Sequence, residues 1–275
     1  MTSTGRTRPD RLLGLAGMEL ALVVAGFLVP LTILIAYAFG RSDPLTFDVT
    51  VIGTLDPFRK LFSETYRPVV VRSLTLAMIT VVACVGVGTP AALALSRLPE
   101  RRSRMILLAV VAPAFVSFTV RIHGWSNLLS SEGVIAQLTG TSLLFRPAGV
   151  AVGMFATYLP LYILPVALAL GRVDEQLCDA AADLGAPPGR ATRTVVLPLA
   201  RPGIVAGAVL VGVLAIGEYI VPTVLGGGRV LLLGNLLNDQ AGGRDQPLGG
   251  AIAVVILSLA LLGGLVARLA MHRSR

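Results

Sequence analysis

Six long apolar segments, separated by polar stretches, constrain the fold of this 275-residue chain more than any other feature. Each is close to the roughly 20 residues that an α-helix needs to cross a lipid bilayer. In lipid a helix satisfies its backbone hydrogen bonds within its own segment, whereas the alternating segments of about ten residues that build a membrane barrel are absent from the sequence. The pattern therefore predicts an all-α membrane protein with six transmembrane helices, at approximately residues 18–39, 69–95, 105–121, 149–170, 203–225 and 249–269.

The composition agrees with a membrane protein. Hydrophobic residues make up 55% of the chain and charged residues 14%, and this composition argues against a water-soluble enzyme. Prolines in or near the apolar segments indicate either kinked helices that line a pathway or ordinary helix packing, and the sequence leaves both open. These prolines are Pro30, Pro90, Pro113, Pro160, Pro165 and Pro222.

The positive charges indicate the orientation of the chain. Of the 23 lysines and arginines, fourteen fall at the two termini and in residues 96–104 and 171–201, and nine fall in the other polar stretches. Because loops rich in Lys and Arg stay in the cytoplasm, we expect a cytoplasmic segment 1–17, a membrane domain 18–270 and a cytoplasmic tail 271–275. The net charge of +8 follows from this distribution, so the expected partner is membrane lipid and not nucleic acid.

The residue types that carry metal or nucleotide chemistry are scattered. Cys84, Cys178, His123 and His272 lie far apart in the sequence, so neither a metal site nor a disulfide is expected. The single lysine, Lys60, does not follow a glycine run, which excludes a phosphate-binding P-loop, and no other catalytic motif is present. We therefore predict no catalytic residue and no cofactor on this chain, and expect any ATP and Mg²⁺ to be used by a partner.

The polar segment 172–201 is predicted to form a helical hairpin. Apolar residues recur at three- and four-residue spacing over residues 173–184, which puts them on one face of a helix. Gly185 can supply a C-terminal cap, and a second short helix is expected from about Pro188. A solvated loop helix is the alternative, but the small alanines and the sharp turn favour a compact knob that contacts another protein.

Within this segment, Asp-Ala-Ala is followed after three residues by Gly, after nine more by Val, and after one more by Leu-Pro. The pattern resembles the EAA loop of ABC-importer permeases, with Asp in place of Glu and Val in place of Ile. The resemblance implies that segment 172–201 is a coupling helix region on which ABC ATPase subunits dock, two of them in the importer. The coupling residues that it assigns are Asp179, Ala180, Ala181, Leu184, Gly185, Val195, Leu197 and Pro198.

Further motifs cover most of the chain, among them Ser73-Leu74-Thr75-Leu76-Ala77, Gly217-Glu218-Tyr219-Ile220-Val221-Pro222 and Gly234-Asn235-Leu236-Leu237. They resemble the spermidine/putrescine-type permeases, and in particular the first permease of the pair. The resemblance implies a type I ABC-importer permease bundle in the bacterial inner membrane and a second permease subunit. It also implies an extracytoplasmic solute-binding protein and a polyamine or similar cation as cargo.

Glu218 is the strongest candidate for a residue that lines the transport pathway. Burying an ionisable group within a membrane span costs free energy, and such a group usually faces a partner or a water-filled cavity. The alternative is a hydrogen-bonded acid at a helix break. Tyr158 and Tyr219 are candidates for cation–π contact with an ammonium group, with ordinary packing as the alternative. Arg121 and Trp125 are expected either to anchor the third span at the membrane interface or to shape an outer gate.

Two other classes compete with this interpretation. A secondary transporter driven by an ion gradient predicts inverted internal repeats and paired intramembrane acids, whereas the sequence has no convincing repeat and one deep acid. A scaffold protein leaves the spaced pattern in segment 172–201 unexplained. We therefore interpret the chain as the permease subunit of an ATP-driven importer, which forms half of the translocation pathway.

Overall fold

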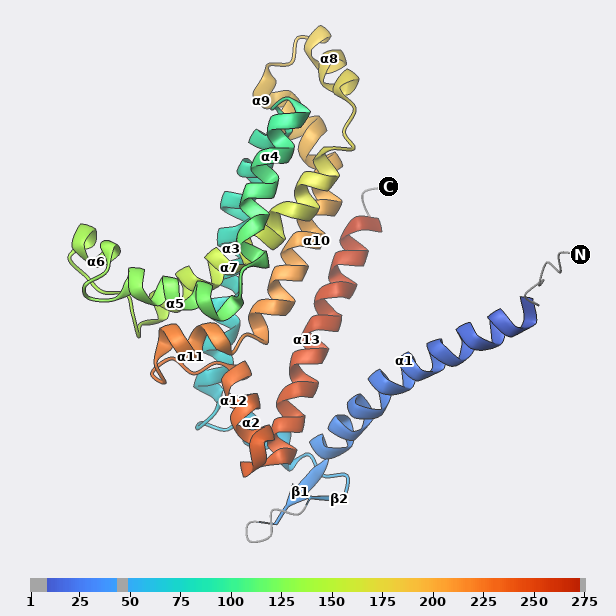
Figure 1. Cartoon of the computed structure of the whole chain (residues 1–275), viewed down its shortest axis with the longest axis vertical. Helices are drawn as coiled ribbons and strands as arrows, with labels where there is room; N and C mark the ends of the chain where they lie inside the picture. The colour runs from blue at the N-terminus through green and yellow to red at the C-terminus, as the bar shows by residue number, and fades with distance from the viewer. Residues whose placement is uncertain (1–8, 44–48, 273–275) are drawn as a thin grey trace, which may run out of the picture.

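The computed structural model describes residues 9–43 and 49–272, and the chain is mostly helical (Figure 1). Residues 1–8 of the expected N-terminal segment and 273–275 of the expected tail lie outside the described residues. The elements are α1 (Pro9–Ala38), β1 (Gly40–Ser42), β2 (Val49–Val51), α2 (Asp56–Leu61), α3 (Arg67–Ser96), α4 (Glu100–Val111), the 3-10 turn η1 (Ala112–Phe115), α5 (Phe118–Leu129), α6 (Val134–Thr139), α7 (Pro147–Leu170), α8 (Glu175–Asp183), α9 (Pro188–Ala191), the π-helical turn η2 (Thr192–Val196), α10 (Leu197–Ile216), α11 (Ile220–Gly226), α12 (Leu233–Asp239), the π-helical turn η3 (Gln240–Arg244) and α13 (Gln246–His272).

Helix α7 is the centre of the bundle and packs against both α3 and α10. Its Tyr162 is fully buried, and the ring lies between Gly88 of α3 and Gly207 of α10. A Cβ atom on Gly88 would come within 2.4 Å of the ring, and one on Gly207 within 3.0 Å. The missing side chains therefore allow three helices to approach one aromatic ring closely, as small residues do in membrane bundles. Thr89 fixes the ring through a 2.7 Å hydrogen bond between its Oγ1 and the Tyr162 hydroxyl.

All six apolar segments lie in helices, which confirms the all-α fold class. Four helices of the described chain are long and apolar enough to cross a membrane: Arg67–Ser96, Pro147–Leu170, Gly189–Ile216 and Gln246–Leu269. The bent pair Glu100–Phe115 and Phe118–Thr139 is a fifth if the two helices form one span. Helix α1 contains a shorter apolar stretch, Leu22–Ala38. The spans predicted over 105–121 and 203–225 each contain a break between two helices.

The third predicted span is broken in its second half. Helix α4 ends at Val111, a 3-10 turn contains Pro113, and α5 starts at Phe118 after a bend of 97° between the two halves. Proline cannot donate the backbone hydrogen bond that would continue the α-helix, and its ring clashes with the preceding turn. Helices α5 and α6 therefore project sideways from the bundle (Figure 1).

The fifth predicted span ends early. Helix α10 stops at Ile216, and α11 begins as a separate helix at Ile220. The break contains Gly217 and Glu218, and the Glu218 carboxylate accepts the backbone N–H groups of Ile220 and Val221. The acid thus satisfies donors at the start of α11 that have no partner within the helix.

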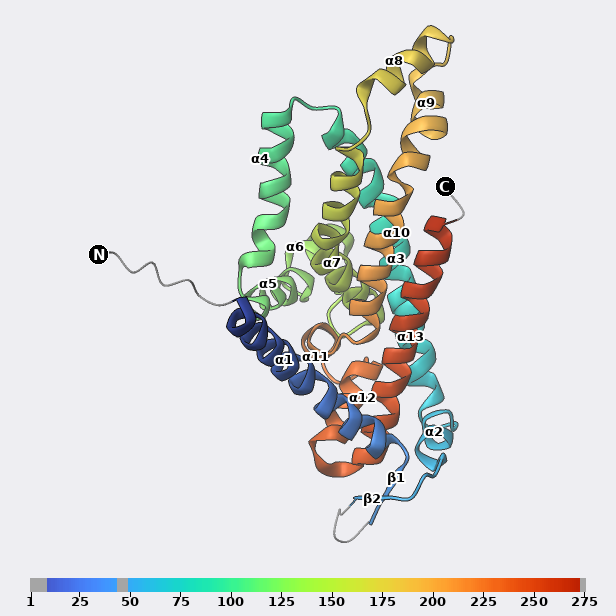
Figure 2. The same ribbon diagram turned by 90° about the vertical axis from the view of Figure 1, so that its right-hand side faces the viewer.

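Helix α1 meets the bundle at its C-terminal end. A Cβ atom on Gly250 of α13 would lie 2.7 Å from the backbone nitrogen of Ala38, so the two helices cross at this glycine. From the crossing, α1 diverges from the other helices (Figures 1 and 2) and exposes apolar side chains such as Leu22 and Phe27, which suits contact with lipid. An antiparallel β1–β2 pair, with Gly40 opposite Val51, follows α1.

A second, smaller core joins α2, α3, α12 and α13 through Leu61, Val70, Leu233, Leu236, Leu248 and Ile252. An ion pair lies beside it, with the Lys60 Nζ 2.5 Å from Oδ2 of Asp245. The other carboxylate oxygen of Asp245 accepts the backbone N–H of Leu248 at the start of α13 (3.2 Å). The hydrogen bond to Asp245 raises the pKa of Lys60 above its ordinary value.

Candidate functional site

The segment between α7 and α10 forms a projecting unit, residues 174–191, which we call the α8–α9 knob. The side chain of Asp174 accepts the backbone N–H two residues further on (3.0 Å), at the start of α8. After α8 ends, Gly185 adopts a left-handed φ of +80°, and the N–H of Ala186 donates to the carbonyl of Ala181 (3.0 Å). This is the hydrogen bond of a Schellman cap, so the predicted helix and its glycine cap are confirmed.

The α8–α9 knob extends beyond the end of the bundle (Figures 1 and 2). Leu184 is 89% exposed, which is costly for a large apolar side chain in water unless another surface covers it. Asp179, Ala180 and Gly185 are also exposed, and Ala181 is half-buried. Five of the eight predicted coupling residues therefore lie on one accessible projection.

The other predicted coupling residues lie at the joint between the knob and α10. Val195 belongs to the π-helical turn η2, and Leu197 and Pro198 begin α10. Arg97, directly after α3, donates from Nη2 to Oγ1 of Thr192 in the same turn (2.8 Å). The joint is thus connected both to α10, through the continuous chain, and to the end of α3.

Glu218 and Tyr158 meet at the break between α10 and α11. Glu218 is only 7% exposed, and its Oε1 accepts the N–H groups of Ile220 (2.8 Å) and Val221 (3.2 Å). Its Oε2 accepts the hydroxyl of Tyr158 from α7. All three donors are neutral, and within the described residues no basic group lies at ion-pair distance from this carboxylate. The local structure is the hydrogen-bonded acid at a helix break that the sequence left as an alternative.

Arg121 lies on α5 and folds back over the bend that precedes this helix. Its Nη1 donates to the carbonyl of Pro113 (2.8 Å), and its guanidinium lies 5.3 Å from the centre of the Phe118 ring. Helix α5, which carries this arginine, packs against α11 and α7. The contacts of Arg121 thus hold the bend between α4 and α5.

The two remaining pathway candidates are placed differently. Trp125 is half-buried and packs against the main hydrophobic core. Tyr219 is 45% exposed and immediately precedes α11. The structure thus brings Tyr158 and Glu218 together, whereas no contact described here joins the side chains of Arg121, Trp125 and Tyr219 to them.

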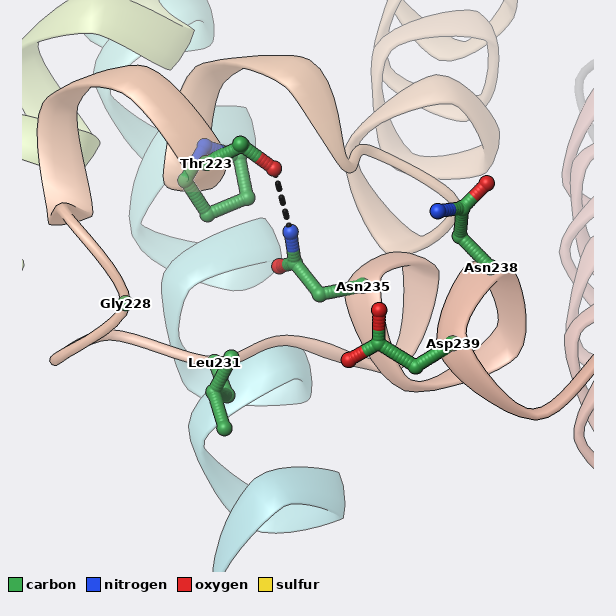
Figure 3. A pocket seen from close by; sticks show the side chains of 7 residues that line it. Thr223, Gly228, Leu231, Asn235, Asn238 and Asp239 are labelled. Carbon is green, nitrogen blue, oxygen red and sulfur yellow. Dashed lines mark hydrogen bonds between the residues drawn. The ribbon is translucent and has the colours of Figure 1, made fainter. Parts of the chain in front are cut away.

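Asn235 supports the break, and the sequence did not single it out for this role. Its Nδ2 donates to the carbonyl of Tyr219 (2.9 Å) and to Oγ1 of Thr223 (2.7 Å), and its Oδ1 accepts the N–H of Leu232 (3.1 Å). Figure 3 shows its bond to Thr223. One amide therefore joins the start of α11 to the start of α12. An asparagine in an apolar stretch is the sequence signal for such a buried polar contact.

Two neighbours of Asn235 extend this support. A Cβ atom on Gly234 would lie 2.5 Å from the carbonyl oxygen of Glu218, so α12 packs directly against the backbone of the break. The N–H of Leu233 donates to Oγ of Ser73 on α3 (2.7 Å). Through these contacts α3 and α12 hold the backbone that positions the Glu218 carboxylate.

A cavity of about 190 Å³ opens between α11 and α12 (Figure 3). It is lined by Pro222, Thr223, Gly228, Leu231, Asn235, Asn238 and Asp239. None of the five predicted pathway residues lines it.

Residues 78–274 match the family described as binding-protein-dependent transport system inner membrane component. The spermidine/putrescine transport system permease protein PotB of Salmonella typhimurium is 31% identical over 256 residues, which cover 87% of this chain and 89% of that protein. PotB of Haemophilus influenzae is 32% identical over 244 residues, covering 86% of this chain and 85% of that protein.

Solved structures show the same fold. A bacterial alginate ABC transporter in complex with an alginate pentasaccharide-bound periplasmic protein superposes with a TM-score of 0.74 at 16% identity, covering 98% of this chain and 95% of that chain. The MetNI methionine ABC transporter in an inward-facing conformation gives a TM-score of 0.59 at 19% identity, covering 78% of this chain and 99% of that chain. These matches leave no support for a secondary transporter or a scaffold protein. The chain belongs to the binding-protein-dependent inner membrane components and is a non-catalytic permease subunit of an ABC importer.

Proposed function

We propose that this permease carries a small organic cation of the polyamine class, and that Glu218 lies on the path of the cargo. The observation that carries the proposal is a buried carboxylate at a helix break, held by neutral donors alone among the described residues. A charge within a membrane bundle usually faces a partner or a water-filled cavity, and an ammonium group is the natural partner of a carboxylate. The names of the relatives from Salmonella typhimurium and Haemophilus influenzae point to the same cargo class.

The surrounding residues suit this role. Tyr158 supplies a hydroxyl and an aromatic ring beside the carboxylate, and aromatic faces attract ammonium ions. Tyr219 lies in the break itself, and Arg121 and Trp125 lie on α5, which packs against α11; we assign these three residues to the walls of the pathway. The second half of the pathway comes from a second permease subunit.

We further propose that the α8–α9 knob docks on an ABC ATPase, with a second ATPase on the partner permease. Exposed Leu184 and the alanine face give the knob an apolar contact surface, and its joint to α10 is continuous helix. ATP and Mg²⁺ then bind to the ATPases and are used there, and neither binds to this chain. This assignment puts the knob, the segment 1–17 and the tail 271–275 in the cytoplasm, leaves 18–270 as the membrane domain, and directs the opposite end toward a solute-binding protein.

The cargo proposal is tested by uptake in proteoliposomes that contain the complete importer and its binding protein. Putrescine and spermidine are expected to compete for uptake, whereas uncharged solutes of similar size are not. Glu218→Gln should reduce transport by about tenfold or more, because hydrogen bonds to charged groups contribute about 1.5–3 kcal/mol. Glu132→Gln, at an exposed acid after α5, is the matched control. Equal transport by Glu218→Gln and Glu132→Gln would remove Glu218 from the path.

The docking proposal is tested at Gly185. A valine there must adopt a left-handed conformation, which costs about 1–2 kcal/mol and deforms the cap, although a Cβ atom would meet nothing within 4 Å. Gly185→Val should weaken co-purification with the ATPase and reduce cargo-stimulated ATP hydrolysis. Gly185→Asn, which tolerates this φ, and Gly189→Ala, where φ is ordinary, are the controls. Unchanged assembly and hydrolysis in the valine variant would exclude the knob as the docking element.

A further inference from the structure

The helix that leaves the α8–α9 knob has an irregular turn directly after the knob. The chain is helical from Pro188 to Ile216, but η2 is π-helical, and the N–H of Leu197 donates to the carbonyl of Thr192, five residues earlier. Turns of this kind are rare, occur mostly at functional sites and are places where helices bend. A displacement of the knob can therefore be taken up at η2 and need not pass into α10.

Arg97 fastens this turn to α3. It is the first residue after α3, and its backbone N–H donates to carbonyl groups of the last helical turn, which fixes its place at the helix end. Its Nη2 donates to Oγ1 of Thr192, the first residue of η2 (2.8 Å). The ion pairs of the described residues do not include Arg97, so no carboxylate among them draws its guanidinium away from the turn. Hydrogen bonds from a charged donor are among the stronger ones.

Helix α3 extends from this joint to the break that contains Glu218. Along the helix, Ser73 and Ser96 are about 35 Å apart, at a rise of about 1.5 Å per residue. Oγ of Ser73 accepts the N–H of Leu233 at the start of α12 (2.7 Å), and the next residue, Gly234, packs against the carbonyl of Glu218. One helix thus contacts the joint of the knob at one end and the support of the break at the other.

The middle of α3 is held by α7. Pro90 lies within α3 and removes one backbone hydrogen bond from it. The preceding residue, Thr89, is hydrogen-bonded to the hydroxyl of Tyr162 on α7 (2.7 Å), and Gly88 packs against the same ring. These contacts fix α3 beside the proline, so a displacement of the Arg97 end is carried past it.

We propose that Arg97 is a positioning residue for coupling, which fixes the π-helical turn to α3 so that a movement of the knob reaches the Glu218 break through α3 and α12. The proposal rests on the proposed functions of the knob as the ATPase docking element and of Glu218 as a pathway residue. Without the Arg97 side chain, the ATPase still docks, but the knob turns at η2 and the break no longer follows it. Rigid helices joined by hydrogen bonds are a physical means by which distant sites are coupled.

The link is tested in the complete importer, with its binding protein loaded with putrescine. Arg97→Ala should leave co-purification of the ATPase at the parent level, whereas putrescine-stimulated ATP hydrolysis should fall by about fivefold or more, a typical size for coupling between sites. Arg97→Lys keeps a charged donor and should restore most of the stimulation. Arg101→Ala, at an exposed arginine on α4, is the matched control. Equal stimulation in the two alanine variants would overturn the link, and so would loss of the ATPase from Arg97→Ala, which would make Arg97 a docking residue.

A second measurement needs no cargo. An environment-sensitive dye is attached through Asn238→Cys on α12, after Cys178→Ser, and its fluorescence is compared without nucleotide and after trapping with ATP and vanadate. The change seen in the parent should shrink by about twofold or more in Arg97→Ala and stay the same in Arg101→Ala. If the cargo proposal alone is wrong, this difference persists although putrescine stimulates no hydrolysis in the parent. If the docking proposal is wrong, Gly185→Val keeps its ATPase. An equal response in the two arginine variants, or none in the parent, overturns the link even where Gly185→Val loses the ATPase.

Discussion

Replacing Gly88 by alanine tests the central packing of the bundle. The new Cβ atom would lie 2.4 Å from Cδ1 and 2.9 Å from Cε1 of Tyr162, against the 3.5–4.0 Å at which carbon atoms attract. The ring has nowhere to move, because Thr89 holds its hydroxyl and Gly207 lies against its other edge. Helices α3 and α7 must therefore separate by about 1 Å, and overpacking of this kind costs about 1–3 kcal/mol.

The expected consequence is a fall in unfolding midpoint of about 2–12 °C, since one kcal/mol corresponds to roughly 2–4 °C for a domain near this size. Cys84 supplies the assay, because it is fully buried on α3 and reacts with a thiol-specific dye only when the bundle opens. The half-buried Cys178 is first replaced by serine.

The control lies two residues away on the same helix. Gly86→Ala meets nothing within 4 Å, and alanine favours a helix over glycine by up to about 1 kcal/mol, so this variant should be equal to or more stable than the parent. Combining Gly88→Ala with Tyr162→Ala should cost no more than Tyr162→Ala alone, because the ring that causes the clash is gone. If Gly88→Ala is as stable as Gly86→Ala, the ring of Tyr162 does not lie between Gly88 and Gly207 as described.

Three further variants probe the end of the bundle near α12. Lys60→Met should lower stability by less than about 1 kcal/mol, since the ion pair with Asp245 is partly exposed. Because the pKa of Lys60 is raised in the folded state, this contribution is present below the ordinary lysine pKa of about 10.4 and disappears as the pH rises through the folded-state pKa, so thermal midpoints of parent and variant should converge above it. Ser73→Ala leaves a buried N–H without a partner, and denaturation should reveal a loss of about 1–3 kcal/mol. Gly234→Ala pushes α12 against the carbonyl of Glu218 and should abolish uptake in complexes that still assemble, whereas wild-type uptake would contradict the described contact.

Local signals predicted the α8–α9 knob well. Its helix, the turn at Gly185 and the short helix from Pro188 follow from residues close together in the sequence, and each agrees with the structure. The same holds for the break near Glu218, which the sequence offered as one of two interpretations. Periodicity and capping are properties of a few neighbouring residues, so they can be read without knowledge of the fold.

Features that depend on distant residues could not be predicted in this way. Proline occurs at positions 90, 160 and 165 within continuous helices, yet Pro113 lies in a sharp bend. Whether a helix continues past a proline depends on tertiary packing around the freed backbone groups, which the local sequence does not contain. Ser73 and Asn235 support the break through contacts with α12 and α11, and the partners of these two residues become visible only when the chain is folded.

The ion pair between Lys60 and Asp245 gives the molecule a chemical reporter of its own. Lys60 is the single lysine of the chain, so an amine-directed reagent has one side-chain target, and that target is protected while the carboxylate holds it. The rate at which Lys60 is modified therefore measures how often α2 separates from the start of α13. No label has to be engineered into the protein.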